Sequence, residues 1–400
     1  MVPVSAVAGR APRVGVVAGE TSGDQLGAAL IDSLRTRSPG IEVRGVCGPL
    51  MRAAGCEPLA DAHELAVMGL VEVLAHLPRL VRLRRRLRRQ MLDWQPDVFI
   101  GIDAPEFNLG LARQLRARGI KTVQYVSPQV WAWRERRVRR IAAACDLVLC
   151  LLPFEPPFYA RHGARAQFVG HPLADQIALD PDRGAARQTL GLGLEATVVA
   201  LLPGSRAGEV SRLGPDFIAA AAALAALRPG LEFIAPMASA RTRELFAAAI
   251  AAAGPDYGQA LRAPQIRLLD GQARLALQAA DAALVASGTA SLEALLCRCP
   301  MVVAYRLGAV TAFLLRALRM VRLPYFSLPN LLAAEKLVPE FFQEAVGGAT
   351  LAAALEAQLA DEPRRAMLSA RFRAIHVGLR CGGAAQAADA VLRLIGRPQW

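Results

Sequence analysis

Lysine is almost absent from this chain of 400 residues, because Lys121 and Lys336 are the only two lysines among its 47 lysines and arginines. The acidic residues number 34, which leaves a formal net charge of +13. A GC-rich genome accounts for the use of arginine in place of lysine, but not for the clustering of the arginines along the chain. A positive charge of this size calls for an anionic partner, such as a phosphate-bearing substrate, a nucleic acid or a lipid surface.

Cysteine pairs at the usual zinc-binding spacing are absent as well. The seven cysteines are scattered and form no C-x-x-C pair, which excludes the usual zinc-binding spacings and favours a reduced, cytoplasmic protein. Residues 1–13 lack the charged stretch and apolar core of a secretory signal, so we expect none there. Hydrophobic residues make up 54% of the chain and charged residues 20%. This composition excludes general disorder, and the length fits two or three domains with cores of their own.

Short apolar runs alternate with amphipathic stretches along the chain, which predicts parallel sheets covered by helices. The expected strands are 14–18, 43–46, 98–102, 122–126, 147–152 and 166–169 in the first half, and 197–202, 231–236, 266–269, 282–285 and 301–304 in the second. A polar segment that contains Pro and Gly separates the two series. We therefore expect an N-terminal domain over 1–172, a linker over 173–195, a C-terminal domain over 196–365 and closing helices over 366–400.

Two Gly/Ser-rich turns occupy matching places in the two halves. Residues 19–24 follow the first strand of one half, and residues 203–209 follow the first strand of the other. Glycines let a ligand approach the backbone closely, and the unpaired N–H groups that open the next helix attract an anion. The pattern predicts two α/β domains in tandem that face a cleft for two substrates.

Further polar residues follow other expected strands, where ligands of open α/β sheets bind. Residues 101–108 carry two acids and an amide, and residues 286–293 carry small hydroxyl residues and an acid. Each motif is weak by itself, because a P-loop lysine and a G-x-G-x-x-G pattern are missing. Ser287-Gly288-Thr289 also fits a plain helix cap, and Asp103 fits a turn.

The arginines cluster in two places, with seven between Arg79 and Arg89 and five between Arg134 and Arg140. The apolar stretch 64–75 precedes the first cluster, but it is too short and too interrupted to supply the ~20 apolar residues of a bilayer span. Two interpretations fit: docking on an anionic membrane face, or a core helix followed by a solvated basic helix. Periodicity alone favours the second. Nucleic-acid binding ranks last, since no zinc-finger or aromatic ribonucleoprotein motif accompanies the charge.

Seven ordered motifs together resemble the lipid-A-disaccharide synthase family. They are AGETSGD (18–24), ELAVMG (64–69), GIDAPEFN (101–108), YVSPQVWAW (125–133), LPGSR (202–206), ASGTA (286–290) and SLPNLL (327–332). The resemblance runs from about residue 14 to about residue 345. It implies a bacterial glycosyltransferase of the α/β, GT-B type, with two Rossmann-like domains, at the cytoplasmic face of the inner membrane.

The implied reaction moves 2,3-diacylglucosamine from its UDP conjugate to the 6-hydroxyl of 2,3-diacylglucosamine 1-phosphate, with inversion and without a cofactor or metal. The resemblance assigns the catalytic base to Asp103, with Glu106 as its nearest rival. It assigns nucleotide binding to Arg206, Ser287, Gly288, Thr289, Glu293 and Asn330, joined by Glu335 and Gln343. It assigns the acceptor side to Glu20, Ser22, Asp24, Glu106 and Asn108.

With the family in view, membrane docking becomes the favoured interpretation of 64–89. The expected membrane-facing residues are Val67, Met68, Leu70, Arg82 and Arg85, and the expected partners are anionic inner-membrane lipids rather than nucleic acid. The family also allows a homodimer through its C-terminal helices. Two alternatives remain: another UDP-GlcNAc enzyme, such as the peptidoglycan transferase or a 2-epimerase, and a non-catalytic membrane-binding protein. Acyl-chain length, ester or amide specificity and oligomeric state are not encoded in any motif here.

Overall fold

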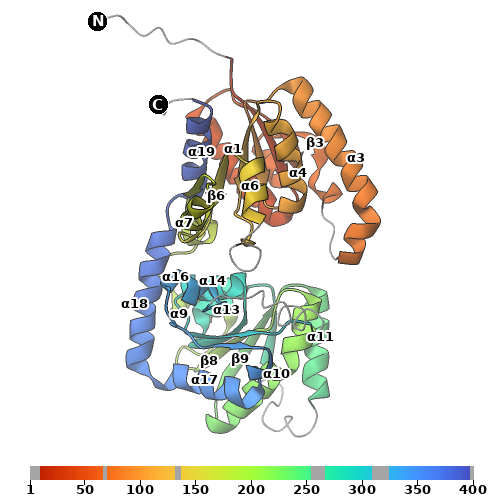
Figure 1. Cartoon of the computed structure of the whole chain (residues 1–400). Coiled ribbons are helices and arrows are strands. Elements are labelled where there is room, and N and C mark those ends of the chain that lie inside the picture. Colours follow the sequence, from red (N-terminus) through yellow and green to blue (C-terminus); the bar gives the residue numbers. More distant parts are fainter. Residues whose placement is uncertain (1–9, 66–69, 131–136, 254–265, 309–323, 397–400) are drawn as a thin grey trace, which may run out of the picture. The chain divides into compact units, whose positions relative to one another are not determined.

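The computed structural model describes residues 10–65, 70–130, 137–253, 266–308 and 324–396. The chain divides into two compact units, which are described separately. Unit 1 contains residues 1–175 and 379–400, and unit 2 contains residues 176–378. Each unit consists of one sheet with helices on both of its faces (Figure 1).

Unit 1 contains a seven-stranded sheet in the order β3-β2-β1-β4-β5-β6-β7. Its strands are β1 (Arg13–Ala18), β2 (Glu42–Cys47), β3 (Glu57–Asp61), β4 (Val98–Ile102), β5 (Lys121–Tyr125), β6 (Leu147–Cys150) and β7 (Ala166–Phe168). Its helices are α1 (Thr21–Arg37), α2 (Pro49–Ala53), η1 (Ala62–Glu64), α3 (Leu70–Trp94), α4 (Pro105–Arg116), α6 (Val138–Ala144), α7 (Glu155–Arg161) and α19 (Gly383–Leu394). The described strands pair in parallel, so their carboxyl ends share one edge.

The two faces of this sheet bury different helices. Leu30 and Leu34 of α1 pack with Val391 of α19 on one face. Leu87 of α3 and Leu111 of α4 pack on the other face. The last described helix of the chain thus completes the core of the first unit. The central strands β1, β4 and β6 are mostly apolar because both faces of the sheet are covered.

Unit 2 contains a six-stranded parallel sheet in the order β10-β9-β8-β11-β12-β13. Its strands are β8 (Val198–Leu202), β9 (Glu232–Met237), β10 (Ile266–Asp270), β11 (Ala282–Ala286), β12 (Met301–Tyr305) and β13 (Glu340–Phe342). Its helices are α9 (Arg183–Leu190), α10 (Ala207–Leu227), α11 (Ala240–Ala252), α13 (Ala273–Ala279), α14 (Thr289–Leu296), α16 (Leu328–Ala333), η3 (Gln343–Ala345), α17 (Gly348–Ala360) and α18 (Glu362–Leu379).

Helix α10 is the one described helix that is long and apolar enough to cross a membrane by length and composition. In the structure it packs against α11 and α17. Its side chains Leu213 and Phe217 are buried in the core of unit 2. Helix α10 is therefore a core helix, and its apolar length reflects this burial.

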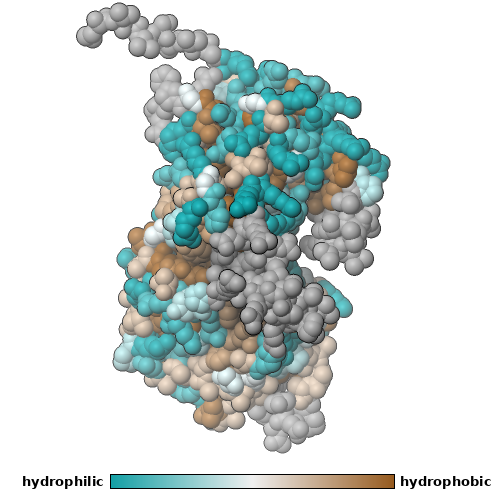
Figure 2. All heavy atoms as spheres, viewed as in Figure 1, coloured by the Kyte–Doolittle hydropathy of each residue, from teal (hydrophilic) through white to brown (hydrophobic). Residues whose placement is uncertain are grey.

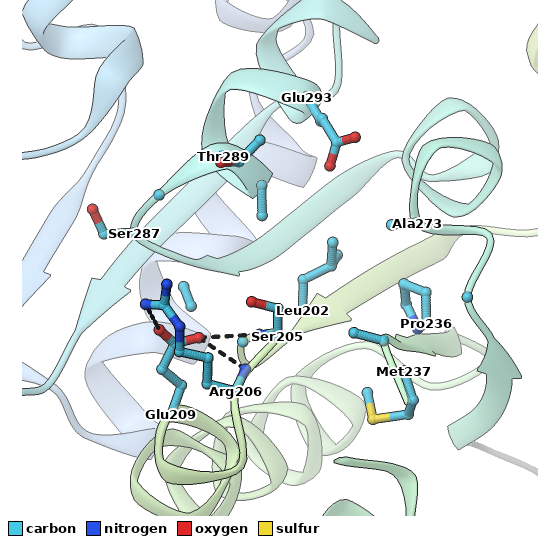
Figure 3. Close-up of a pocket in the computed structure, with 16 residues that line it drawn as sticks. Leu202, Ser205, Arg206, Glu209, Pro236, Met237, Ala273, Ser287, Thr289 and Glu293 are labelled. Carbon is cyan, nitrogen blue, oxygen red and sulfur yellow. Dashed lines mark hydrogen bonds and ion pairs between the residues drawn. The ribbon is translucent and has the colours of Figure 1, made fainter. Parts of the chain in front are cut away.

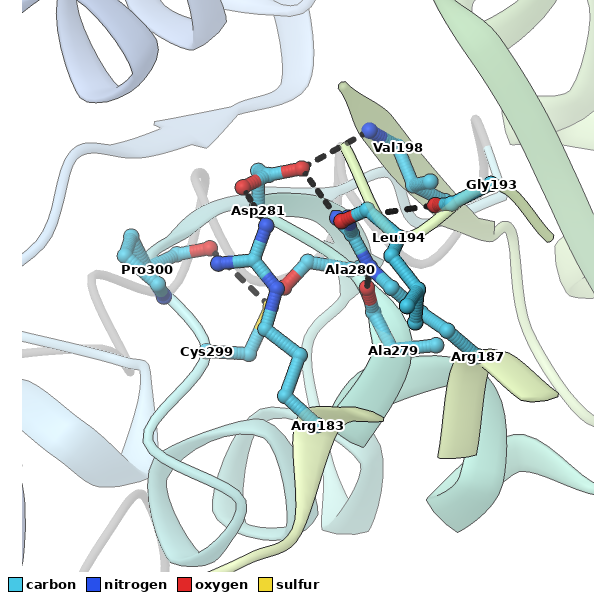
Figure 4. A network of polar contacts seen from close by, with 10 residues as sticks. All are labelled: Arg183, Arg187, Gly193, Leu194, Val198, Ala279, Ala280, Asp281, Cys299 and Pro300. Atoms are coloured by element: carbon cyan, nitrogen blue, oxygen red, sulfur yellow. Dashed lines mark hydrogen bonds and ion pairs between the residues drawn. The ribbon is translucent and has the colours of Figure 1, made fainter. Parts of the chain in front are cut away.

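The unit boundaries differ from those expected from the sequence. The segment 173–195, expected as a linker, contains most of α8 (Pro172–Gln176) and all of α9. Helix α9 is tied into unit 2 by a buried ion pair between Arg187 and Asp281 (Figure 4). The closing segment 366–400 is also divided, because unit 2 extends through Gly378 and α19 belongs to unit 1. The polar composition of this segment gave no sign of its long-range partners.

Candidate active site

A pocket of about 340 Å³ opens at the carboxyl edge of the unit 2 sheet (Figure 3). Pro236 and Met237 from the end of β9 line one side, together with Ala273. Arg206 and Ser287 line the other side. The pocket therefore has an uncharged wall and a polar wall, and its volume is in the range of small-molecule sites.

The turn after β8 forms part of the polar wall. Gly204 has a φ of 135°, and a Cβ there would lie 2.4 Å from the Cβ of Glu209, so only glycine fits. The backbone N–H groups of Ser205 and Arg206 donate to Glu209 Oε2 at 3.0 and 3.3 Å. The Arg206 side chain is 85% exposed and lies 3.5 Å from Glu209 Oε1. An exposed guanidinium at this rim is suited to bind the oxygens of a diphosphate.

Glu209 was not predicted as a site residue from the sequence. Its carboxylate stabilises the turn by accepting hydrogen bonds from N–H groups that would otherwise attract an anion at the start of α10. The signal was present, because an acid three residues after a helix cap is a capping pattern. The site therefore has two anion-attracting features that remain directed at the pocket: the Arg206 side chain and the start of α14.

The turn after β11 supplies the second of these features. Gly288 has a φ of 138° and caps α14, while Thr289 and Ala290 line the pocket. Ser287 is fixed by its N–H donating to Ala304 O at 3.0 Å. The first N–H groups of a helix have no partner within it, and they carry a partial positive charge. This turn is suited to bind phosphate oxygens.

Glu293 lies one turn into α14 and also lines the pocket. Burial raises the pKa of its carboxyl group, and the nearby positive charge of Arg274 lowers it in part. An ionised carboxylate at this place accepts hydrogen bonds from neighbouring hydroxyl groups, as a ribose diol presents them. Five of the residues expected at a nucleotide thus come together in one pocket; they are Arg206, Ser287, Gly288, Thr289 and Glu293.

The other three expected nucleotide residues do not line this pocket. Asn330 is buried, accepts from Val338 N at 2.9 Å and donates to Glu340 Oε2 at 3.1 Å. Glu335 is ion-paired with Arg371 on the surface. Gln343 accepts from Leu307 N at 2.9 Å. Each thus has a structural contact, and its contact with a nucleotide stays a prediction.

Asp103 follows β4 at the carboxyl edge of the unit 1 sheet. Its φ is 52° and that of Ala104 is 39°, a left-handed pair without glycine that costs about 1–2 kcal/mol per residue. The Asp103 carbonyl accepts from Asn108 Nδ2 at 2.8 Å and from Gln124 Nε2 at 3.0 Å. Burial raises the pKa of Asp103, and a hydrogen bond from the Ala104 backbone lowers it in part. A carboxylate held this way is suited to accept a proton.

The other expected acceptor residues differ in exposure. Glu20 and Ser22 are exposed at the start of α1. Asp24 is buried and accepts from the backbone N–H groups of Gly48, Leu50 and Met51 at 2.9–3.1 Å, so it caps α2.

Glu106, the rival base, is exposed and bonded through both oxygens to Arg137 at 2.6 and 2.8 Å. Asn108 is fully buried, and its amide donates to the Asp103 carbonyl. Contact of any of these acceptor residues with a substrate remains a prediction.

The expected membrane segment is only partly described. Val67 and Met68 lie outside the described residues, as do residues 131–133 of the motif 125–133. Leu70 begins α3, whose side chains are described from Pro78 onward. Arg82 and Arg85 are exposed on α3, while its inner face packs in the core. Figure 2 shows hydrophilic residues over much of the visible face of unit 1, with apolar residues between them.

No group of three or more His, Cys, Asp or Glu that could hold a metal ion occurs in the part of the chain that the structure describes. Of the cysteines described there, all but Cys381 are buried.

Comparison with known proteins agrees with this architecture. The family model for lipid-A-disaccharide synthetase matches residues 14–391. The lipid-A-disaccharide synthase of Xanthomonas euvesicatoria pv. vesicatoria (strain 85-10) is 49% identical over 98% of this chain and 88% of that protein. The synthase of Sodalis glossinidius (strain morsitans) is 52% identical over 96% of this chain and 98% of that protein.

Among solved structures, the calicheamicin glycosyltransferase CalG4 resembles the fold with a TM-score of 0.57 and 19% identity, over 97% of this chain and 99% of that chain. The two parallel α/β units are thus of the GT-B type. A family match over nearly the whole chain, joined by relatives about half identical in sequence, establishes that the chain belongs to the lipid-A-disaccharide synthase family of glycosyltransferases.

Proposed function

We propose that the chain transfers 2,3-diacylglucosamine from UDP-2,3-diacylglucosamine to the 6-hydroxyl of 2,3-diacylglucosamine 1-phosphate. The products are the β-1,6-linked tetraacyl disaccharide 1-phosphate and UDP. The observation that carries this proposal is the family match over residues 14–391. The pocket of unit 2 supports it, because its polar wall suits a diphosphate and its uncharged wall suits a nucleobase.

The leaving group is UDP, so the site has to stabilise negative charge that develops on the diphosphate. The guanidinium of Arg206 and the N–H groups that open α14 both supply opposite charge from the polar wall of the pocket. The Glu293 carboxylate accepts hydrogen bonds from the hydroxyl groups of the ribose. These contacts position the nucleotide and lower the barrier to its departure.

The α-linked donor gives a β-linked product, so a single displacement suffices. In this step the 6-hydroxyl oxygen of the acceptor forms a bond to the anomeric carbon as the bond to the diphosphate breaks. The hydroxyl proton passes to a base, and Asp103 is the group to which we assign this role. Its raised pKa improves it as a proton acceptor while leaving it ionised above that pKa.

The direct test is an assay of the purified chain with both substrates in mixed detergent micelles. Mass spectrometry is expected to show UDP and tetraacyl disaccharide 1-phosphate in equal amounts. UDP release without disaccharide would contradict the proposal. An epimerised UDP-sugar as product would assign the chain to the alternative UDP-GlcNAc activity.

Glu293 offers a test of the nucleotide site. Replacing Glu293 with alanine removes the acceptor for the ribose hydroxyls, and we expect UDP affinity to fall by about tenfold or more, as for the loss of charged hydrogen bonds. Isothermal titration calorimetry measures this change. Glu244→Ala, an exposed glutamate on α11, is the matched control. Equal UDP affinity in the Glu293 variant and the wild type would remove Glu293 from the site.

We also propose that the protein binds the cytoplasmic face of the inner membrane through the basic surface of α3. Each arginine near an anionic surface contributes about 1 kcal/mol. The double variant Arg82→Glu with Arg85→Glu is therefore expected to lose at least about tenfold in binding to anionic vesicles. Arg113→Glu with Arg118→Glu, which changes the charge equally at exposed positions of the same unit, is the control. Equal binding of the wild type to neutral and anionic vesicles would contradict this proposal.

A further inference from the structure

Three aromatic side chains gather at the carboxyl edge of the unit 2 sheet, outside the lining of the pocket. Tyr305 ends β12, Phe342 ends β13, and Phe326 precedes α16. Their ring centroids lie 5.9–6.3 Å apart. We call Tyr305, Phe326 and Phe342 the aromatic cluster. None of the three belongs to the main core of unit 2, and Phe342 is 40% exposed.

Polar contacts hold the aromatic cluster in place. The Glu340 carboxylate accepts from the backbone N–H of Phe326 at 3.2 Å and from that of Ser327 at 3.0 Å. The same carboxylate accepts from the amide of Asn330 at 3.1 Å. Strand pairing sets Tyr305 opposite Phe342. The backbone beside Phe326 is thus fixed by a charged group, while the ring of Phe342 leaves part of the cluster exposed.

The aromatic cluster adjoins the polar wall of the pocket. In the β11–β12 pair, Ala286 lies opposite Ala304, so the turn at Ser287 begins beside Tyr305. Ser287 Oγ donates to the carbonyl of Phe326 at 3.4 Å. The charges of Glu209, Arg212 and Arg206 act on the Tyr305 hydroxyl, although burial is the main cause of its raised pKa. The cluster is thus close to the pocket residues expected to hold the diphosphate.

The strand order gives the order of the three surfaces along the carboxyl edge of the unit 2 sheet. Along the edge from β10 and β9 through β8 and β11 to β12 and β13, the uncharged wall comes first, then the polar wall and then the aromatic cluster. Figure 3 shows Pro236 and Ala273 on one side of the pocket and Ser287 on the other. A UDP-sugar has the same order of base, diphosphate and sugar. With its base at the uncharged wall and its diphosphate at the polar wall, a UDP-sugar would direct its sugar toward β12 and β13.

We propose that the aromatic cluster is the binding site for an acyl chain of the donor sugar. The inference rests on the proposed function, which supplies a donor with two acyl chains next to the diphosphate. An acyl chain requires an apolar surface, and each buried methylene contributes about 0.8 kcal/mol. The cluster provides such a surface within unit 2, beyond the diphosphate end of the pocket. It would favour diacylated over non-acylated UDP-sugars.

The test measures binding to the full chain without turnover. Calorimetry compares UDP, UDP-GlcNAc and UDP-2,3-diacylglucosamines with shorter and longer acyl chains, all below their critical micelle concentrations. The wild type is expected to bind the longer chains more tightly. In Phe342→Ser, affinity for the long-chain donor is expected to fall about fivefold or more and the chain-length dependence to flatten, while UDP affinity stays within about twofold.

Two further variants serve as controls. Phe342→Leu keeps an apolar side chain and is expected to restore much of the chain-length dependence. Leu227→Ser changes an exposed leucine at the end of α10 and is expected to bind every ligand as the wild type does. An unchanged chain-length dependence in Phe342→Ser would overturn the proposal, as would an equal loss of UDP affinity.

An error in the proposed acyl-chain site and an error in the proposed function give different results. The wild type could form the disaccharide while Phe342→Ser keeps the dependence of donor affinity on acyl-chain length. In that case the function stands and the assignment of the acyl-chain site is wrong. If the wild type binds acylated and non-acylated UDP-sugars equally and forms no disaccharide, both are wrong.

Discussion

Replacing Asp103 with asparagine is expected to reduce turnover by about 10²- to 10⁴-fold, the usual contribution of a general base. Asparagine has nearly the same shape as aspartate but cannot take up the proton of the sugar's 6-hydroxyl. The pocket that we assign to UDP lies in the other unit, so UDP affinity is expected to stay unchanged. Steady-state kinetics and calorimetry with UDP measure the two quantities.

Glu106→Gln is the matched control for this experiment. Glu106 is exposed and engaged with Arg137, so its replacement is expected to cost much less activity. Substantial turnover in Asp103→Asn would remove Asp103 from the role of base. A loss in Glu106→Gln equal to that in Asp103→Asn would assign the role to both carboxylates together.

The same assignment predicts a pH dependence. Burial raises the pKa of Asp103, and the base works only when it is ionised. Activity of the wild type is therefore expected to fall as the pH drops through this raised pKa, with a midpoint above the ordinary value of about 3.9. A pH profile of kcat/KM measures the midpoint. A profile without an acid limb above that value would contradict the role of Asp103.

Replacing Asp281 with alanine is expected to lower the free energy of unfolding of unit 2 by about 3–5 kcal/mol, because it leaves a buried arginine unpaired. Arg187 is 2% exposed, and its Nη2 lies 2.8 Å from Asp281 Oδ2 (Figure 4). The same oxygen accepts from Val198 N at 2.8 Å, and Arg183 pairs with the other oxygen. Asp281 thus joins α9 to β8, across residues that sequence analysis assigned to a linker.

Urea unfolding measures this loss, and hydrogen exchange of β8 and β11 reports on unit 2 alone. Asp270→Ala is the control, since its carboxylate is 79% exposed and pairs with Arg243 on the surface. It is expected to cost no more than about 1 kcal/mol. The double variant Asp281→Ala with Arg187→Met is expected to recover part of the stability, because it removes the unpaired charge. A loss in Asp281→Ala as small as in the control would contradict a stabilising role for the network.

The sequence predicted most of the sheet architecture, because a parallel strand covered on both faces is an uninterrupted apolar run. The expected strand 98–102 coincides with β4, and 14–18 and 282–285 fall within β1 and β11. Two edge strands were missed, β3 (Glu57–Asp61) and β13 (Glu340–Phe342). Both are short and carry acidic residues, so their pattern is no different from that of a loop.

Sequence by itself determined the family, the two parallel α/β units and the residues of the two turns that form the pocket. These features depend on residues close together in the chain, where strand, glycine and helix start follow in order. Tertiary structure alone decided which polar groups meet across the fold: Gln124 and the Asp103 carbonyl, Glu340 and the backbone N–H of Phe326, and Asp281 and Arg187. Such contacts join strands and helices that are far apart in the chain. The sequence around a single polar residue does not show which distant residue it contacts. Their positions follow only from the packing that brings the strand ends together.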